Sequence, residues 1–145
     1  MIWLLRHAHA LRGAPDAERP LSDRGEADAA AAGRALAALG VSFDCCLTSP
    51  KVRALDTARL ACAELGLEPE VERALADGDF DAAALAAGRG EQVLLVGHEP
   101  GMSRAIGDLT GARAEMAKGG VAAVEGRELK LLLRPAELRA LARLR

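Results

Sequence analysis

Short apolar runs alternate along the chain with longer amphipathic stretches. Residues 1–5 are apolar throughout and residues 92–96 are nearly so, which predicts strands that are covered on both faces. A third strand is expected at residues 43–48. Weaker patterns predict strands at residues 70–72, 121–124 and 129–133, with Gly126 joining the last two.

Helical patterns follow most of these runs. Ser22 can cap a helix that has acidic residues in its first turn, and Gly40 should end it. The apolar face of this helix consists of Ala29, Ala32, Leu36 and Leu39.

A second long helix is expected after the strand at residues 43–48. Ser49 and Pro50 predict its N-cap and first position, and the pattern continues to about residue 65. Its buried side is expected to carry Val52, Leu55, Cys62 and Leu65. Short helices are predicted at residues 81–87 and 102–109, and a last one begins at Pro135.

Strands that alternate with helices imply βαβ units and a largely parallel sheet. The 145 residues suit one domain, and they contain no repeat, low-complexity tract or interdomain linker. We therefore predict an α/β fold for residues 1–145: a single-domain, three-layer sandwich with a mostly parallel central sheet and helices on both faces.

Composition argues against several classes of partner. The net charge is −2, and aromatic residues make up 2% of the chain, so a nucleic-acid partner is not expected. Cys45, Cys46 and Cys62 are odd in number and lack metal-site spacing, which indicates reduced structural cysteines. Arg6 interrupts the first apolar run too early for a signal peptide, and no stretch approaches the about 18 apolar residues of a membrane span. We expect a cytoplasmic protein without a membrane partner; the sequence does not indicate an oligomeric state.

Cationic and imidazole side chains follow the predicted strands. Arg6 and His7 come directly after the first strand, Arg53 lies in the first turn after the second, and His98 follows the strand at residues 92–96. Carboxyl ends of parallel strands meet at one edge of a sheet, so these side chains should converge. Guanidinium groups and a helix N-terminus suit a phosphoryl group, and a neutral imidazole can attack phosphorus near pH 7.

Three motifs carry a family resemblance. LLRHAHA, LTSPKVRALDTA and LLVGHEP, in this order, resemble the motifs of the histidine phosphatase superfamily. The chain length and the segment RPLSDRGEADAAAAG resemble most the short phosphohistidine phosphatases of that superfamily. The resemblance implies a phosphoglycerate mutase-like fold and a hydrolase that uses neither a metal nor another cofactor.

The resemblance also implies a role for each matching residue. His7 would be the phosphorylated nucleophile, and Arg6 and Arg53 would hold the phosphoryl group. His98 would complete the pocket and stabilise charge on the equatorial oxygens. Arg19, in the RPL segment, is a further candidate contact to the substrate.

The sequence departs from the family pattern at two places. Ala8 replaces the usual glycine after the catalytic histidine, and we expect activity to survive because a methyl group is small. Many members of the family supply a glutamate as general acid shortly after the strand near residue 71, but Ala74 and Leu75 stand at about that place here. Asp77 and Asp79 are nearby carboxylates that could take its role. A missing acid is tolerable for a phosphohistidine substrate, because the leaving imidazole has a pKa of about 6.5 and can depart protonated.

The expected substrate is therefore a phosphohistidine-bearing protein of a signalling or phosphotransfer system. A small phosphorylated substrate remains the alternative, as do a catalytically weak phosphate-binding regulatory domain and, less favoured, a phosphomutase. The pair His7 and His9 also has a zinc-like spacing, but the barrel enzymes with that feature need about 250 residues. His9 is expected at the mouth of the pocket. The acidic pair around Gly78 lacks the closing glutamate of a calcium loop, so we expect a turn there.

Overall fold

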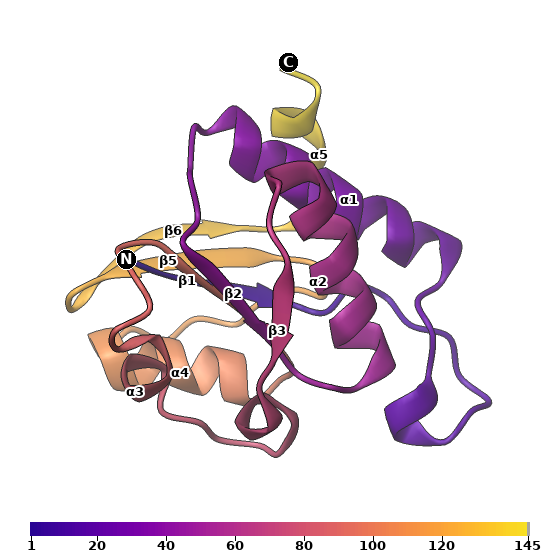
Figure 1. The fold of residues 1–145 in the computed structure, drawn as a ribbon, viewed down its shortest axis with the longest axis horizontal. Coiled ribbons are helices and arrows are strands. Elements are labelled where there is room, and N and C mark those ends of the chain that lie inside the picture. Colours follow the sequence, from indigo (N-terminus) through magenta and orange to yellow (C-terminus); the bar gives the residue numbers. More distant parts are fainter. Residues whose placement is uncertain (145) are drawn as a thin grey trace.

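The computed structural model describes residues 1–144, and within them six strands form one sheet with helices on both faces (Figure 1). The strands are β1 (Ile2–Arg6), β2 (Cys45–Thr48), β3 (Pro69–Val71), β4 (Val93–Gly97), β5 (Val121–Glu125) and β6 (Glu128–Leu133). The helices are α1 (Asp23–Ala38), α2 (Val52–Leu65), α3 (Ala82–Ala86), α4 (Gly101–Thr110) and α5 (Pro135–Ala142). Short 3₁₀ turns, η1 (Asp16–Glu18) and η2 (Arg73–Ala76), lie in the connections.

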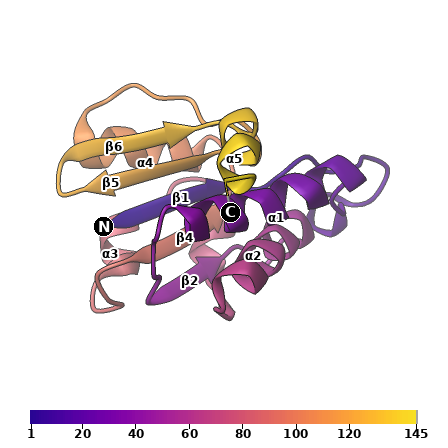
Figure 2. The same cartoon turned by 90° about the horizontal axis from the view of Figure 1, so that it is seen from above.

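The sheet has the strand order β3-β2-β4-β1-β5-β6. Its first four strands are mutually parallel, whereas β5 is antiparallel to both β1 and β6. The predicted α/β fold class with a mostly parallel central sheet is therefore confirmed. The two strands joined through Gly126 form its antiparallel edge, which Figure 2 shows beside β1.

Alternating side chains of β1 supply two cores. Trp3 and Leu5 pack toward the layer of α1, α2 and α5, whereas Leu4 packs toward α3 and α4. This alternation follows from the two-residue period of a strand. Each central strand is therefore apolar on both faces, which explains why the runs at its position in the sequence are continuous.

Helix α1 follows the prediction at its start but not along all of its face. The Ser22 hydroxyl accepts a hydrogen bond from Gly25 N at 3.1 Å, as a cap should. Leu36 is fully buried, but Leu39, predicted on the same face, is 42% exposed. The reason is that α1 ends at Ala38, so Leu39 lies in the turn beyond the helix.

The predicted start of α2 was wrong by two residues. Ser49 does not cap the helix; its N–H continues the ladder of the sheet by donating to Val96 O at 3.0 Å. The helix begins at Val52, with Lys51 as its N-cap residue. The hydrogen bonds of the ladder thus continue one residue past the end of β2, and the Ser49 hydroxyl does not cap the helix.

The buried face of α2 also differs from the prediction. Cys62 is fully buried as expected, but Val52, Leu55 and Leu65 are only partly buried. The other fully buried positions are Ala54, Ala58 and Ala61, along with Thr57. Small residues line this face because α1 and α2 approach closely: a Cβ at Gly33 would collide with the Ala61 backbone.

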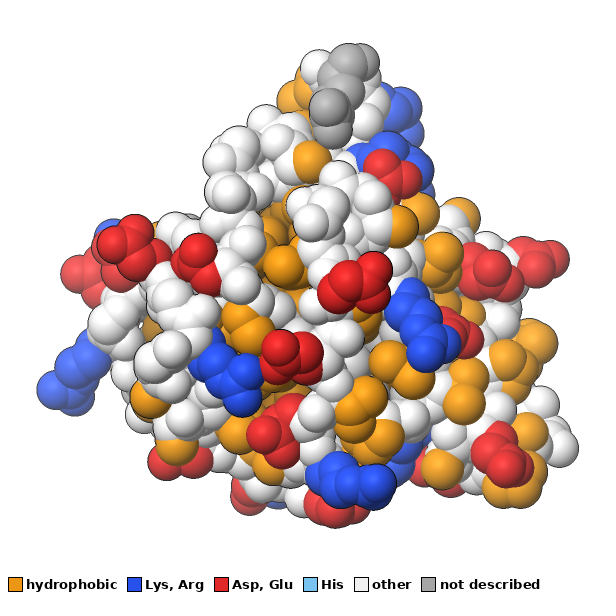
Figure 3. Space-filling model, in the orientation of Figure 1, with side chains coloured by type: hydrophobic (Ala, Val, Ile, Leu, Met, Phe, Trp, Pro, Cys, Tyr) orange, Lys and Arg blue, Asp and Glu red, His pale blue; other side chains and the backbone are white. Residues whose placement is uncertain are grey.

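Three further observations concern the surface, the helices and the cysteines. Acidic and basic side chains are interspersed over the face drawn in Figure 3. Among residues 1–144, no helix has both the length and the apolar character that crossing a membrane would require. The three cysteines are free and buried.

Candidate active site

The carboxyl ends of β1 and β4 bring His7 and His98 together. Arg6 pairs with Gly97 in the parallel ladder, and His7 N donates to Gly97 O at 2.9 Å, so the next residue of each chain segment lies at the same edge. The two imidazole rings are 5.2 Å apart between centroids and tilted by 50°. The structure thus brings the two histidines together at the sheet edge, as the sequence predicted.

The ring of His7 is held in one tautomer. Its Nδ1 lies 2.8 Å from Ala8 O, and a carbonyl oxygen can only accept, so Nδ1 carries the proton. The lone pair is therefore on Nε2. The residue is 7% exposed, and burial, followed by the charges of Arg53 and Arg6, lowers its pKa to about 4. The imidazole is neutral at pH 7.

Ala8 supports this arrangement through its backbone as well. Its N–H donates to the Thr57 hydroxyl at 3.1 Å, and that hydroxyl donates to Arg53 O at 2.7 Å. Its methyl group packs with Leu21 and Ala29, on the side of α1. The methyl that replaces the family's glycine hydrogen is accommodated by this small apolar cluster.

His98 contacts a residue that the sequence analysis assigned elsewhere. Its Nε2 lies 2.8 Å from the Ser49 hydroxyl, and its Nδ1 is buried with no hydrogen-bond partner among residues 1–144. Burial, and then the charges of His7 and Arg53, lower the pKa of His98 to about 3. Ser49 was missed as a site residue because a serine before a proline and a helix is ordinarily read as a cap.

Arg53 lies in the first turn of α2 and is 7% exposed. Its Nη1 donates to Asp16 O at 2.7 Å, and its Nη2 lies 3.3 Å from Asp16 Oδ1. Lys51 Nζ lies 3.2 Å from the same carboxylate. The hydrogen bond from Lys51, with help from the charge of Arg53, lowers the pKa of Asp16. No sequence motif pointed to Asp16, which η1 brings to the site from the loop after β1.

Arg6 is fixed at the other side of His7. Its Nη1 donates to Met116 O at 2.8 Å, and burial lowers its pKa although Glu99 and Glu115 oppose the effect. The Nε–H groups of Arg6 and Arg53 are both buried without a hydrogen-bond partner among residues 1–144. Buried donors of this kind ordinarily have acceptors, so they indicate an oxyanion site between the two guanidinium groups.

The remaining predicted residues, Arg19 and His9, form their polar contacts with residues other than the histidine pair. Arg19 donates through Nε to Leu11 O at 2.9 Å and lies 3.6 Å from the Asp16 carboxylate, so it joins the site through Asp16. His9 contacts the Ser22 hydroxyl at 2.7 Å through Nδ1 and is partly buried.

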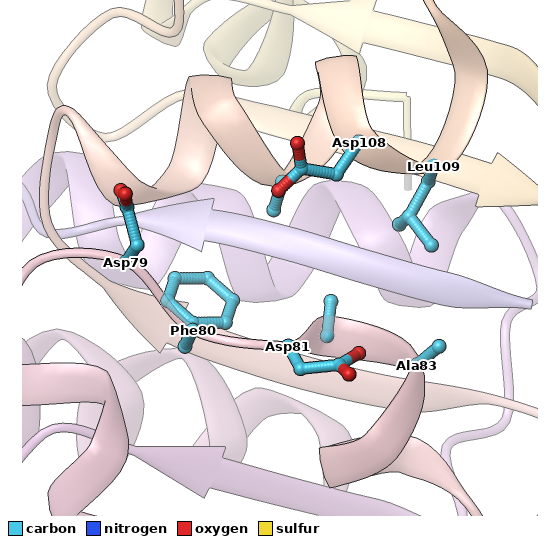
Figure 4. A pocket seen from close by; sticks show the side chains of 8 residues that line it. Asp79, Phe80, Asp81, Ala83, Asp108 and Leu109 are labelled. Carbon is cyan, nitrogen blue, oxygen red and sulfur yellow. The ribbon is translucent and has the colours of Figure 1, made fainter.

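The two candidate acids have separate surroundings. Asp77 and Lys51 line one hollow of about 260 Å³. Asp79 pairs with Arg104 at 3.0 Å and lines a different hollow of about 480 Å³, where Figure 4 shows it near Phe80. Of the two, Asp77 is the one that shares a hollow with Lys51, whose ammonium group contacts the Asp16 carboxylate that also contacts Arg53. No group of three or more His, Cys, Asp and Glu side chains within residues 1–144 is arranged to hold a metal ion.

Comparisons with known proteins agree with this geometry. Solved structures with the same fold include the protein histidine phosphatase SixA complexed with tungstate, which is 22% identical. It aligns over 94% of this chain and 98% of its own, with a TM-score of 0.83. A putative phosphohistidine phosphatase SixA from Agrobacterium tumefaciens is 25% identical over 92% of this chain and 97% of its own, with a TM-score of 0.80. The predicted phosphoglycerate mutase-like fold is therefore confirmed.

Sequence comparison gives the family. A protein of Picosynechococcus sp. described as uncharacterized is 38% identical over 109 residues. The match spans 68% of this chain and 66% of that protein, just under two thirds of its length. The family model described as histidine phosphatase superfamily (branch 1) matches residues 2–84, more than half of the chain. The chain therefore belongs to the histidine phosphatase superfamily, as its motifs predicted.

Proposed function

We propose that this protein removes the phosphoryl group from a phosphohistidine side chain of another protein, through a covalent phosphohistidine on His7 and without a metal ion. The observation that carries the proposal is the tautomer of His7. Its Nδ1 proton is held by Ala8 O at 2.8 Å, so the Nε2 lone pair is available as a nucleophile beside His98.

Substrate binding would use the two buried guanidinium groups. The phosphoryl oxygens would accept from Arg6 and Arg53, whose Nε–H groups have no other acceptor among residues 1–144. The helix N-terminus next to Arg53 adds positive potential. These fixed charges favour a dianion and would orient phosphorus toward His7.

The first chemical step would form the bond between His7 Nε2 and phosphorus while the bond from phosphorus to the substrate imidazole breaks. The electron pair of the broken bond stays on the imidazole, which leaves neutral if it arrives carrying a proton on its other nitrogen. In the second step, water attacks phosphorus, the bond to Nε2 breaks, and both protons of the water stay on the phosphate product. His7 returns to its starting form with Nδ1 protonated.

A strong general acid is less necessary for this substrate than for a phosphoester. An imidazole leaving group has a pKa of about 6.5, whereas an alkoxide must be protonated as it departs. Asp77 is our candidate donor for ester substrates, because it shares a hollow with Lys51 while Asp79 is paired with Arg104. Ester hydrolysis should therefore be slower than phosphohistidine hydrolysis.

The test is to trap the intermediate. The protein is mixed with ³²P-phosphoramidate in the presence of EDTA and quenched in alkali, and the labelled residue is found by mass spectrometry. We expect an acid-labile label on His7 that is lost to water over time and no label in His7→Gln. The matched control His9→Asn should form and lose the label as the parent does.

Four outcomes would contradict the proposal in different ways. Equal release of phosphate by His7→Gln would exclude the nucleophile. A requirement for added metal would exclude the metal-free mechanism. A label that forms but is not released would favour the phosphate-binding regulatory domain. If p-nitrophenyl phosphate is hydrolysed faster than a phosphohistidine peptide, the small-molecule phosphomonoesterase is the better assignment.

A further inference from the structure

A basic groove lies next to the N-termini of α1 and α5, and His9, two residues after His7, is among the residues that line it. It is a hollow of about 410 Å³ whose walls include the cationic side chains of Arg24, Lys118, Arg134 and Arg139. Asp28 is the one acidic residue that lines it. We call this hollow, with its four cationic side chains, the basic groove. The whole chain carries a net charge of −2, so this local excess of positive charge is not a property of the surface in general.

Two of the four cations are already neutralised. Arg139 Nη1 lies 2.6 Å from Asp28, and Arg134 Nε lies 3.0 Å from Glu137. Arg24 and Lys118 are exposed and form no ion pair with any residue in the described range 1–144. They are therefore the two charges in the groove that are available to an external anion.

The groove is connected to the proposed nucleophile through the backbone. Gly119, the residue after Lys118, donates its N–H to Arg6 O at 3.1 Å and to His7 O at 3.0 Å. The charge of Lys118 contributes to lowering the pKa of His7, after burial and the nearer arginines. A substrate whose phosphoryl group reaches His7 would therefore have its neighbouring parts close to the groove.

We infer that the basic groove binds an acidic stretch of the phosphorylated protein, adjacent to the phosphohistidine in its sequence or on its surface. This inference rests on the proposed function and adds a substrate preference to it. The hollow is far larger than a phosphate and lies outside the arginine pair that would hold the phosphoryl group. Its two unpaired cations, Arg24 and Lys118, are exposed, and charge complementarity at exposed positions steers partners and selects among them. A small ligand would instead need an enclosed and largely apolar pocket.

The test uses two synthetic phosphohistidine peptides that are identical except for the flanking residues, which are aspartates in one and lysines in the other. Phosphoramidate serves as a substrate too small to reach the groove. Four proteins are compared: the parent, the single variant Arg24→Glu, the double variant that combines Arg24→Glu with Lys118→Glu, and Arg127→Glu. The last of these is a matched charge reversal outside the groove. Arg127 follows Gly126 in the turn between β5 and β6, at the opposite end of the sheet from His7.

For the parent at low salt, kcat/KM should be about tenfold higher for the aspartate-flanked peptide, the size expected of two exposed charge pairs. The preference should fall as salt is raised, because the Debye length shortens to about 10 Å at 0.1 M. The double variant should lose the preference, and Arg24→Glu should lose part of it. Arg127→Glu should keep it, and phosphoramidate turnover should be the same in all four proteins at about pH 8, where His7 is neutral in each.

Arg24→Glu should fold as the parent does, since an acidic residue in the first turn of α1 interacts favourably with the helix dipole. Equal turnover of both peptides by the parent would overturn the inference, as would a preference that survives in the double variant. A parallel loss of phosphoramidate turnover would also overturn it, because it would place these residues in the phosphoryl site. Binding of the unphosphorylated aspartate peptide, measured by fluorescence anisotropy, separates the two proposals. If no substrate is hydrolysed but this binding is present and lost in the double variant, the proposed function fails and the groove stands.

Discussion

Acid should destabilise this protein, and His7 should account for a definable part of the loss. Burial lowers the pKa of His7 from its ordinary value of 6.5 to about 4 in the folded chain. In the unfolded chain the side chain is solvated and its pKa returns to about 6.5. As the pH falls from 8 to 5, the unfolded chain binds a proton that the folded chain does not, so the free energy of unfolding decreases.

The size of the effect follows from the two pKa values. At pH 5 the unfolded imidazole is almost fully protonated and the folded one is mostly neutral, which costs about 2 kcal/mol of stability relative to pH 8. His98, with a pKa of about 3, should add a loss of similar size. The pair together would remove about 4 kcal/mol, a large part of the roughly 5–15 kcal/mol that stabilises a typical domain.

Urea unfolding of the parent and of His7→Gln, at pH 8 and pH 5, isolates the contribution of His7. Every other titrating group, His9 included, is present in both proteins and largely cancels in the difference. When the pH falls from 8 to 5, the free energy of unfolding should decrease by about 2 kcal/mol less in the variant than in the parent. Removing the His7 ring also leaves the pKa of His98 less depressed, because His7 contributes to lowering it. This change reduces the variant's loss of stability in acid as well. If the difference is the same at both pH values, or if His7 titrates near 6.5 by NMR, the argument from burial is refuted.

Three substitutions test the support around the site. Thr57→Val removes the acceptor of the buried Ala8 N–H and should cost about 1–3 kcal/mol in urea unfolding, whereas Thr57→Ser should cost less; equal losses would contradict the role of the hydroxyl. Gly33→Ala should destabilise by more than about 1 kcal/mol, since its Cβ would collide with the backbone of α2, and an unchanged unfolding midpoint would show that the helices can separate without cost. Asp16→Asn keeps the backbone carbonyl that accepts from Arg53 but removes the negative charge beside the guanidinium. Inorganic phosphate should therefore inhibit the variant at a concentration about threefold lower than the parent. Weaker inhibition would mean that the carboxylate is needed to position the guanidinium.

The convergence of the main site residues could be predicted because it depends on the parallel direction of the strands that precede them. His7 and His98 each follow a buried strand, and parallel neighbours deliver the next residue to the same edge. Arg53 could be placed by the same logic, in the first turn of the helix that follows β2. For such residues the apolar runs and the polar residue at each end contain the necessary information.

Residues that reach the site from loops could not be predicted in this way. Asp16 contacts Arg53 because the connection after β1 folds back as a 3₁₀ turn, and nothing in its periodicity indicates that path. Asp77 and Asp79 are two residues apart, yet they line different hollows. The direction of a side chain in an irregular loop depends on contacts with distant segments, which local pattern does not encode.

Ser49 shows how a correct local rule can fail when a tertiary contact competes with it. Serine before proline satisfies the pattern of a helix start, and the pattern alone has no reason to prefer another use. In the fold, the ladder between β2 and β4 extends through Ser49 N and Val96 O, and this places the hydroxyl 2.8 Å from His98. A cap two residues later costs little by comparison, because water and the remaining chain can satisfy the first helical N–H groups.

The depressed pKa values and the proposed part of His98 are consistent once the substrate's charge is included. Without an anion, burial and the neighbouring cations keep both rings neutral, which preserves the lone pair on His7 Nε2. A phosphoryl dianion held between Arg6 and Arg53 would oppose those cations and raise the pKa of His98, since a nearby negative charge favours the protonated form. His7 would respond less, because its Nδ1 proton is already engaged with Ala8 O and its Nε2 is directed to phosphorus in the proposed mechanism. The same buried site can therefore hold one histidine as a nucleophile and protonate the other, with the substrate itself determining when the proton arrives.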